Sequence, residues 1–303
     1  MKERLRILPE IAEALAARRP VVALESTIIT HGMPAPRNLE TARAVEAAVR
    51  AGGAVPATIA ILDGTIRVGL TPAELERLAE EESVAKVSRA DLAAVLTAGG
   101  AGSTTVAATM ICADLAGIRI FATGGIGGVH RGAEQSFDVS ADLQELARTP
   151  VAVVCAGAKA SLDLPKTLEV LETLGVPVIG YGCDALPDFY SRDGGLAVPL
   201  RRESAAAIAA VMAAKWDLGL GGGLMIANPI PQEHEIPADT IAAHIDAALA
   251  EAAAQGVQGK AVTPFLLARL EQSTGGASLD ANVALVLNNA RLAAEIAGAY
   301  AVL

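Results

Sequence analysis

Two residues of this 303-residue chain follow apolar segments directly and carry side chains suited to covalent and acid–base chemistry. Glu25 ends the run VVALE, and Lys159 follows the run VAVVCA within AGAKA. Such runs, bounded by Gly or Pro, predict buried strands, and residues just past the carboxyl ends of strands line the ligand crevice of open α/β sheets. Small apolar neighbours keep water from the Lys159 amine, which favours its neutral, nucleophilic form. A carboxyl beside Leu24 could keep its proton and act as a general acid.

Both residues also have an ordinary structural explanation. Lys159 could extend its aliphatic stem from the strand end and leave its ammonium group in solvent. Glu25 could pair with a nearby arginine or with a backbone donor. The two explanations stay open on these residues alone.

The segment between Lys159 and the preceding predicted strand is rich in glycine and contains two aspartates. The loop TGGIGG, with glycines from 124 to 128, predicts a tight turn that needs positive φ. It is not a dinucleotide-binding fingerprint, because the spacing is wrong and no clear helix follows. Asp138 and Asp142 are four apart, and Ser140 could cap a helix through Leu146, which would make one aspartate a first-turn charge. A single acidic residue is poor evidence for a metal.

A second segment, AGGAGSTTVAATM, leads through Ser103, Thr104 and Thr105 into an apolar helix. Free backbone N–H groups at such a helix start, together with the helix dipole, make a potential anion site, although most such caps bind nothing. The P-loop pattern is missing, which argues against a nucleoside triphosphate. Lys86, in the short predicted strand 84–87, and Arg131 could meet an anion or remain solvated.

Composition restricts the class of ligand. The chain has 24 Lys and Arg against 34 Asp and Glu, a formal net charge of −10, which argues against a nucleic-acid polymer or an anionic membrane as partner. A small phosphorylated ligand remains possible where cations cluster. Three cysteines in apolar or Gly-flanked surroundings, a charged N-terminus and the lack of any run of about 18 apolar residues predict a soluble, cytoplasmic protein with reduced thiols.

Periodicity and turn signals predict one α/β domain over 1–303, with three layers and a mixed central sheet. Its aromatic content is only 3%, so the core must be built from Ala, Val, Leu and Ile. The loop 183–195 is long enough for a lid or a subunit contact, and we expect a homo-oligomer. The predicted strands are 21–25, a hairpin over 55–68 turning at Asp63-Gly64, 84–87, 118–122, 151–156, 176–181 and 224–227. The predicted helices are 8–19, 37–51, 72–82, 164–175, 202–217, 236–254, 263–272 and 278–300.

Four motifs together resemble one known family. ALESTIITHGMP, FATGGIGGVHRGAE, FDVSADL and TPVAVVCAGAK are similar, in this order, to the motifs of the pseudouridine-5′-phosphate glycosidases, also called indigoidine synthase A-like proteins. The resemblance extends from about Ala23 to Asn289.

The resemblance implies a role for individual residues. It makes Glu25 the general acid and Lys159 the nucleophile, places Lys86 against the substrate's phosphate, and has Asp138 bind Mn²⁺, one ion per subunit. It also implies a homotrimer. The other substrate-binding residues that it implies are Thr105, Val106, Ser140, Ala141, Asp142 and Asn282, with Asn282 at the uracil base. His130 could help to position uracil or could support a neighbouring residue of the site.

These residue types suit the cleavage of a carbon–carbon glycosidic bond. In pseudouridine 5′-phosphate the base is joined to ribose through carbon, so the sugar must provide an electron sink and uracil C5 must receive a proton. A lysine amine that forms an iminium at C1′ and a neutral carboxylic acid meet these needs. The alternatives are a Schiff-base carbon–carbon lyase acting on another sugar phosphate, and a non-catalytic protein that binds nucleotides or sugar phosphates.

Overall fold

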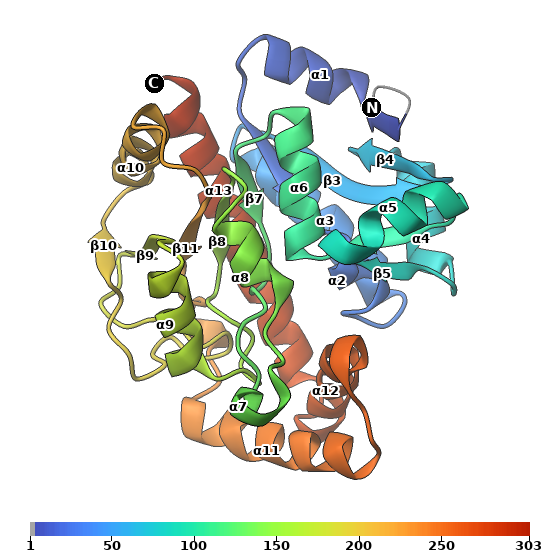
Figure 1. The fold of residues 1–303 in the computed structure, drawn as a ribbon, viewed down its shortest axis with the longest axis vertical. Coiled ribbons are helices and arrows are strands. Elements are labelled where there is room, and N and C mark those ends of the chain that lie inside the picture. Colours follow the sequence, from blue (N-terminus) through green and yellow to red (C-terminus); the bar gives the residue numbers. More distant parts are fainter. Residues whose placement is uncertain (1–3) are drawn as a thin grey trace.

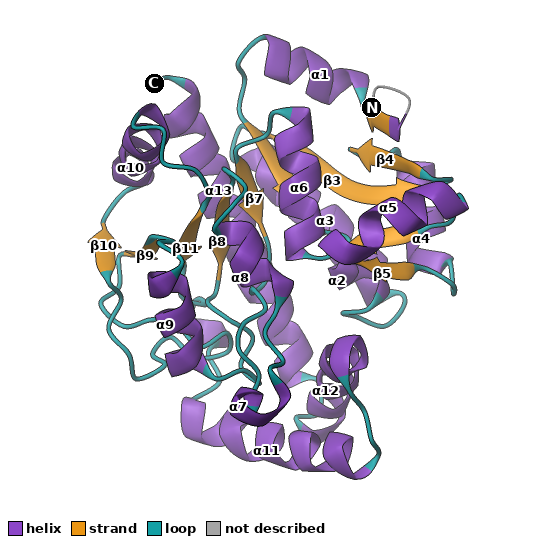
Figure 2. Cartoon of the chain, in the orientation of Figure 1, coloured by secondary structure: helices purple, strands orange, loops and turns teal. Residues whose placement is uncertain are grey.

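The computed structural model describes residues 4–303, and a mixed eleven-stranded sheet runs through it (Figures 1 and 2). The main path has the order β1-β4-β3-β2-β7-β8-β11-β9-β10, and β5 and β6 lie off this path, with β6 pairing with both β3 and β5. The strands are β1 (Leu5–Ile7), β2 (Val21–Leu24), β3 (Val55–Leu62), β4 (Thr65–Val68), β5 (Ala85–Val87), β6 (Gly102–Thr104), β7 (Ile120–Ala122), β8 (Ala152–Cys155), β9 (Val178–Tyr181), β10 (Leu200–Arg202) and β11 (Leu224–Ala227).

The helices cover both faces of the sheet, as Figure 2 shows. They are α1 (Pro9–Ala16), α2 (Thr27–Thr30), α3 (Arg37–Ala51), α4 (Pro72–Glu80), α5 (Arg89–Ala98), α6 (Val106–Ala116), α7 (Ala133–Ser136), α8 (Ala141–Leu146), α9 (Leu164–Thr173), α10 (Ala205–Asp217), α11 (Ala238–Ala254), α12 (Val262–Ser273) and α13 (Ala277–Ala301), with the 3₁₀ turns η2 (Gln232–His234) and η3 (Gly259–Ala261). No described helix is long and apolar enough to cross a membrane.

The central strands pair in parallel, so their carboxyl ends meet at one edge. Strands β2, β7, β8, β11 and β9 form this parallel part, and the first half of β3 joins it beside β2. The second half of β3 turns back as an antiparallel hairpin with β4. Asp63 and Gly64 both have positive φ, which a two-residue hairpin turn of this type requires. The predicted hairpin and the mixed sheet are confirmed.

Alternation along the strands produces two cores. In β2, Val21 and Ala23 belong to the core that also contains residues of α1, α6, α8 and α9, whereas Val22 and Leu24 belong to the core that contains residues of α3, α10 and α13. Each strand of the parallel part is therefore buried on both sides, as its continuous apolar sequence predicts. The predicted three layers are confirmed.

Residues 238–273, which form α11, η3 and α12, extend from the carboxyl edge of the sheet, and we call them the cap. The cap lies at the lower end of the view in Figure 1, with α13 leading from it back into the body. Helix α13 spans 25 residues and contacts α3, α10 and α12. The cap therefore faces the edge where the parallel strands end.

Several details differ from the sequence-based predictions. The first helix ends at Ala16, because Arg18 takes a positive φ before Pro20. The short elements β1, α2, β6, α7 and β10 were not predicted. Tertiary pairing accounts for the three strands, because β1 joins β4, β6 joins β3 and β5, and β10 joins β9. The glycines of TGGIGG do not have positive φ; they are needed for close packing instead.

Candidate active site

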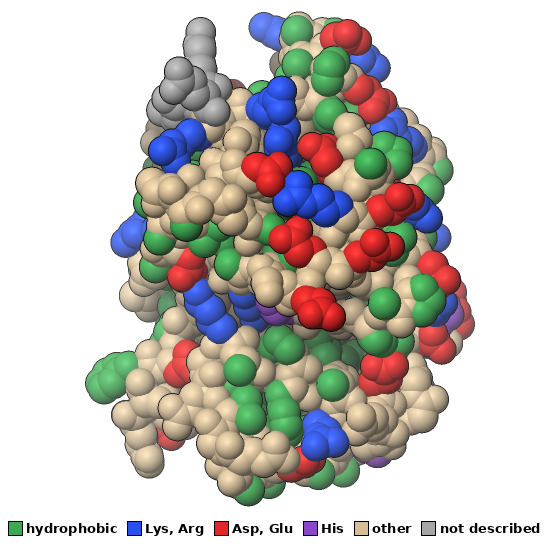
Figure 3. Space-filling model, turned by 90° about the vertical axis from the view of Figure 1, so that its right-hand side faces the viewer, with side chains coloured by type: hydrophobic (Ala, Val, Ile, Leu, Met, Phe, Trp, Pro, Cys, Tyr) green, Lys and Arg blue, Asp and Glu red, His purple; other side chains and the backbone are tan. Residues whose placement is uncertain are grey.

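A cavity of about 290 Å³ lies between the cap and the carboxyl edge of the sheet. Figure 3 shows the molecule hollowed here, with Lys or Arg and His side chains above the hollow and apolar side chains below it. Every site residue that the family resemblance implies lines this cavity: Glu25, Lys86, Thr105, Val106, His130, Asp138, Ser140, Ala141, Asp142, Lys159 and Asn282. The fold thus brings together segments from almost the whole chain, as expected for the carboxyl ends of parallel strands.

Glu25 follows β2 and is held by two threonine hydroxyls. Thr27 donates a hydrogen bond to Oε2, and Thr123, which follows the neighbouring strand β7, donates to Oε1. Glu25 is only 9% exposed, so both carboxyl oxygens have protein partners where water is scarce. No arginine pairs with Glu25 among the described residues, so the alternative that Glu25 pairs with an arginine is wrong.

Lys159 is placed by the backbone that surrounds it. Its N–H donates to the carbonyl of Ile126 at 3.0 Å, and the N–H of Ile126 donates to Gly157 at 3.1 Å, so the glycine loop runs alongside the segment after β8. Gly157 has φ +89°, and a Cβ there would run into the carbonyl oxygen of Pro187. The Lys159 side chain is half-buried, lines the cavity and makes no hydrogen bond or ion pair within residues 4–303. Its amine can therefore reach a ligand.

Asp142 joins the glycine loop to the start of α6. Its Oδ1 accepts from the N–H of Ala107 at 2.9 Å, and its Oδ2 accepts from the N–H of Gly127 at 2.8 Å. Ser140 caps α8 as predicted, accepting from the N–H of Asp142 at 3.2 Å. A Cβ on Gly127 would run into Ser140, so this position must be glycine for the loop to approach so closely. The predicted anion site at the start of α6 needs correction, because Asp142 itself takes one of the N–H groups there.

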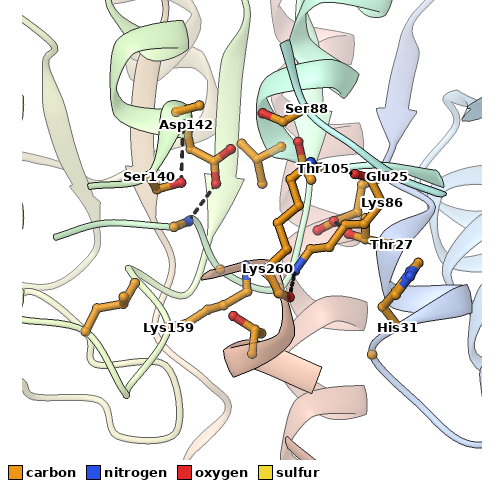
Figure 4. Close-up of a pocket in the computed structure, with 18 of the residues that line it drawn as sticks. Glu25, Thr27, His31, Lys86, Ser88, Thr105, Ser140, Asp142, Lys159 and Lys260 are labelled. Atoms are coloured by element: carbon orange, nitrogen blue, oxygen red, sulfur yellow. Dashed lines mark hydrogen bonds between the residues drawn. The ribbon is translucent and has the colours of Figure 1, made fainter. Parts of the chain in front are cut away.

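Lysine side chains from two directions enter the same cavity (Figure 4). Lys86 comes from β5, and Lys260 comes from η3 in the cap. The Nζ of Lys86 donates to the carbonyl of Lys260 at 3.2 Å, and the Nζ of Lys260 donates to the carbonyl of Lys86 at 3.2 Å. Burial lowers the pKa of Lys86, and the nearby charge of Lys159 lowers it further. A local cluster of cations therefore exists despite the net negative charge.

Asp138 and His130 face each other in the cavity. Their closest side-chain atoms, His130 Nδ1 and Asp138 Oδ2, are 3.9 Å apart, and the Asp138 side chain is 43% exposed. The backbone N–H of His130 donates to the Asp138 carbonyl at 3.0 Å. Within residues 4–303, no three His, Cys, Asp or Glu side chains converge to hold a metal. The carboxylate oxygens of Asp138 fit a hard divalent ion only if water molecules supply most of the ion's other ligands.

Three residues considered from the sequence take other roles. Arg131 pairs with Asp246 of α11 at 2.7 Å and does not line the cavity. Thr104 is fully buried, where its hydroxyl donates to the Ile59 carbonyl at 2.8 Å. Asn289, where the family resemblance ends, is also fully buried, and its Nδ2 donates to the carbonyl of Thr123 at 2.8 Å. Asn289 thus helps to fix the segment that holds Glu25.

Several residues of the site have no clear signal in the sequence. Thr123 lies within the motif FATGG, and Lys260 lies between the predicted helices 236–254 and 263–272. His31 lines the cavity with its pKa lowered, mainly by burial and then by the charge of Lys86. Phe189, from the loop expected as a lid or subunit contact, is 4% exposed and forms a cavity wall. The one sequence signal for Thr123 is that it is a polar residue directly after a predicted strand.

Comparisons with known proteins agree with this arrangement. The family model described as "Indigoidine synthase A like protein" matches residues 10–299. A pseudouridine-5′-phosphate glycosidase of Jannaschia sp. (strain CCS1) is 68% identical over 96% of each chain, and one of Paracoccus denitrificans (strain Pd 1222) is 66% identical over 97% of each. Among solved structures, the prealnumycin C-glycosynthase AlnA in complex with ribulose 5-phosphate superposes with a TM-score of 0.91 at 42% identity, covering 98% of this chain and 97% of its own.

A second solved structure, an indigoidine synthase A-like protein of Thermotoga maritima, has a TM-score of 0.88 and 36% identity, covering 97% of this chain and 95% of its own. The family model, the sequence relatives and the solved structures all cover nearly the whole chain. The chain therefore belongs to the indigoidine synthase A-like family.

Proposed function

We propose that the protein is a pseudouridine-5′-phosphate glycosidase, which reversibly cleaves the carbon–carbon glycosidic bond to give uracil and ribose 5-phosphate. The observation that carries the proposal is that Glu25 and Lys159 line one cavity from strands on either side of β7. The relatives that carry this name are similar over nearly their full length, which supports the same substrate.

The proposed chemistry uses the Lys159 amine as the nucleophile whose electron pair takes the place of the C1′–C5 bond. The amine bonds to C1′ of the ribose as the C1′–O4′ bond breaks and the ring oxygen takes a proton. The nitrogen electron pair then forms the C1′=N bond, while the electrons of the C1′–C5 bond pass to uracil. Water adds to the resulting iminium and releases ribose 5-phosphate and the free amine.

Glu25 supplies the proton that uracil C5 needs in this scheme. As the proton leaves, a negative charge forms on the carboxyl group, and the hydroxyls of Thr27 and Thr123 donate to its oxygens. Donors already in place at a developing charge stabilise the transition state without reorganising. His130 and Asn282, which line the cavity, would position uracil.

The remaining cavity residues would hold the sugar phosphate. Lys86 is the cation proposed at the phosphate, with Thr105, Val106 and the segment 140–142 beside it. Mn²⁺ would be held by Asp138 with water as the other ligands, and when bound the ion would supply positive charge beside the substrate.

Two further properties belong to the proposal. A homotrimer is proposed, and sedimentation equilibrium of the purified chain tests it. A cytoplasmic location is proposed because Cys112, Cys155 and Cys183 are all free thiols; location in fractionated cells of the source tests it.

The deciding experiment incubates the protein with ribose 5-phosphate, uracil and Mn²⁺ and reduces a parallel sample with borohydride. We expect pseudouridine 5′-phosphate as product and a reduced pentose phosphate on Lys159, located by mass spectrometry. Lys159→Ala should lose both. Lys166→Ala is the matched control, because Lys166 is an exposed lysine nearby that pairs with Glu134 and Asp163 outside the cavity.

Other results would identify a different activity. An adduct on Lys159 without the C-nucleotide would indicate a Schiff-base lyase acting on another sugar phosphate. Binding of ribose 5-phosphate with neither adduct nor product would indicate a non-catalytic phosphosugar-binding protein. Either result would refute the glycosidase.

A further inference from the structure

Lys260 is the one lysine that the cap contributes to the cavity within the described residues. It lies in η3, directly before α12, and its side chain extends along that of Lys86 from the body (Figure 4). With Lys86 and Lys159 it places three ammonium groups on one cavity of a chain whose formal net charge is −10. Such a concentration of positive charge suits a dianionic phosphate.

The contacts of Lys260 join the cap to the body, but they do not hold its ammonium group firmly. Besides the reciprocal 3.2 Å bonds between the two lysines, its ammonium group pairs with the Asp91 carboxylate of α5. The Lys260 side chain is 53% exposed and that of Asp91 is 32% exposed. Exposed ion pairs contribute little stability. The Lys260 ammonium can therefore exchange the Asp91 carboxylate for a more strongly charged phosphate at small cost.

The two buried acidic groups of the cavity are already held by protein donors. Asp142 is held by two backbone N–H groups, and Glu25 is held by two hydroxyls. The pKa of Lys86 is lowered by burial, by the charge of Lys159 and, least, by that of Lys260, whereas the charges of Glu25 and Asp142 raise it. The ammonium groups therefore repel one another, and a bound anion between them would relieve that repulsion.

We propose that Lys260 is a second phosphate-binding residue, which meets the substrate's phosphate together with Lys86, so that the body and the cap share its recognition. This inference rests on the proposed function, because it assigns a second cation to the phosphate of that substrate. It also gives the cap a role, since a phosphate bound by both lysines holds the cap against the body.

The test compares Lys260→Ala with Asp91→Asn. Both substitutions remove the same ion pair, and asparagine keeps an oxygen that can accept the 2.9 Å bond from the Ser88 N–H. Titration calorimetry with ribose 5-phosphate, inorganic phosphate and unphosphorylated ribose separates binding of the phosphate from binding of the sugar. We expect Lys260→Ala to weaken ribose 5-phosphate binding about 10- to 100-fold, the loss of one charge-assisted hydrogen bond, and to leave ribose binding unchanged.

The remaining measurements distinguish recognition from a structural contact. Asp91→Asn should leave the affinity for ribose 5-phosphate within about twofold or increase it, and Lys260→Arg should recover part of the loss. In turnover of pseudouridine 5′-phosphate, Lys260→Ala should raise KM far more than it lowers kcat. Equal losses in Lys260→Ala and Asp91→Asn would refute the inference, because they would show that only the ion pair matters. An equal loss of ribose binding would refute it too.

The binding measurements do not depend on the glycosidase activity. If the wild-type protein binds ribose 5-phosphate but forms no C-nucleotide, the proposed function fails, and the comparison of the two variants still decides the role of Lys260. If the wild-type protein turns over pseudouridine 5′-phosphate and Lys260→Ala binds ribose 5-phosphate normally, the proposed function stands and the inference on Lys260 is refuted.

Discussion

Replacing Thr123 by valine removes one of the two hydroxyls that donate to Glu25 and keeps the shape of the side chain. Thr123 is 1% exposed, so water cannot easily replace the lost donor. A hydrogen bond to a charged group contributes about 1.5 to 3 kcal/mol. In the proposed mechanism a negative charge forms on Glu25 as it gives its proton to uracil, so we expect this loss mainly in the transition state. The predicted result is a kcat about 10- to 100-fold lower with KM within about threefold.

Thr58→Val provides a matched control for this prediction. Thr58 is 3% exposed and donates to the carboxylate of Glu46, which does not line the cavity. Both variants lose a hydroxyl that donates to a glutamate, so both should unfold at a temperature about 3 to 6 °C lower. Only Thr123→Val should lose turnover of pseudouridine 5′-phosphate. A kcat within about twofold of wild type in Thr123→Val would refute the role given to the two hydroxyls.

Three further predictions concern the loop 183–195, the glycine loop and the metal. Burial raises the pKa of Asp188 from 3.8 to about 6, so its contribution to the free energy of unfolding is complete below about pH 4 and is lost as the pH rises through 6. In urea unfolding, the free energy of unfolding of Asp188→Asn should exceed that of wild type by up to about 3 kcal/mol at pH 8 and equal it at pH 4. Gly127→Ala should raise KM and lower the unfolding temperature, because its Cβ would displace Ser140, whereas Gly221→Ala, which has open space, should change neither. Asp138→Asn should weaken Mn²⁺ binding measured by electron paramagnetic resonance, and unchanged binding would place the ion elsewhere.

Most elements could be predicted because their signals are local. The helix over 37–51 is found with exactly these bounds, and the capping box at Thr71 has both of its hydrogen bonds. The hairpin at Asp63-Gly64 follows from the turn chemistry of two residues. These features depend on neighbours within a few positions, which a single sequence contains.

The missed features depend on residues far apart in the chain. The Asn289 side chain of α13 is buried and makes hydrogen bonds with Thr123 and Asn228. Neither pairing has a signal in the local sequence. The glycines at 125 and 127 were assigned to a turn with positive φ, yet they are required by the approach of Phe189 and Ser140. The contact of Lys260 with Lys86 joins segments 174 residues apart. Only the folded chain shows such pairings.

The elements that hold the two halves of the site differ in rigidity. Glu25, Thr123 and Lys159 follow adjacent parallel strands buried on both faces, and Asn289 ties the Thr123 segment to α13. Lys86 lies in the short strand β5, which pairs with β6 beside the main path of the sheet, and Lys260 comes from the cap. Bond cleavage needs atoms held to within about half an ångström, whereas a phosphate between flexible lysines tolerates movement. Substitutions along β2, β7 and β8 should therefore act mainly on kcat, and substitutions in β5 and the cap mainly on KM.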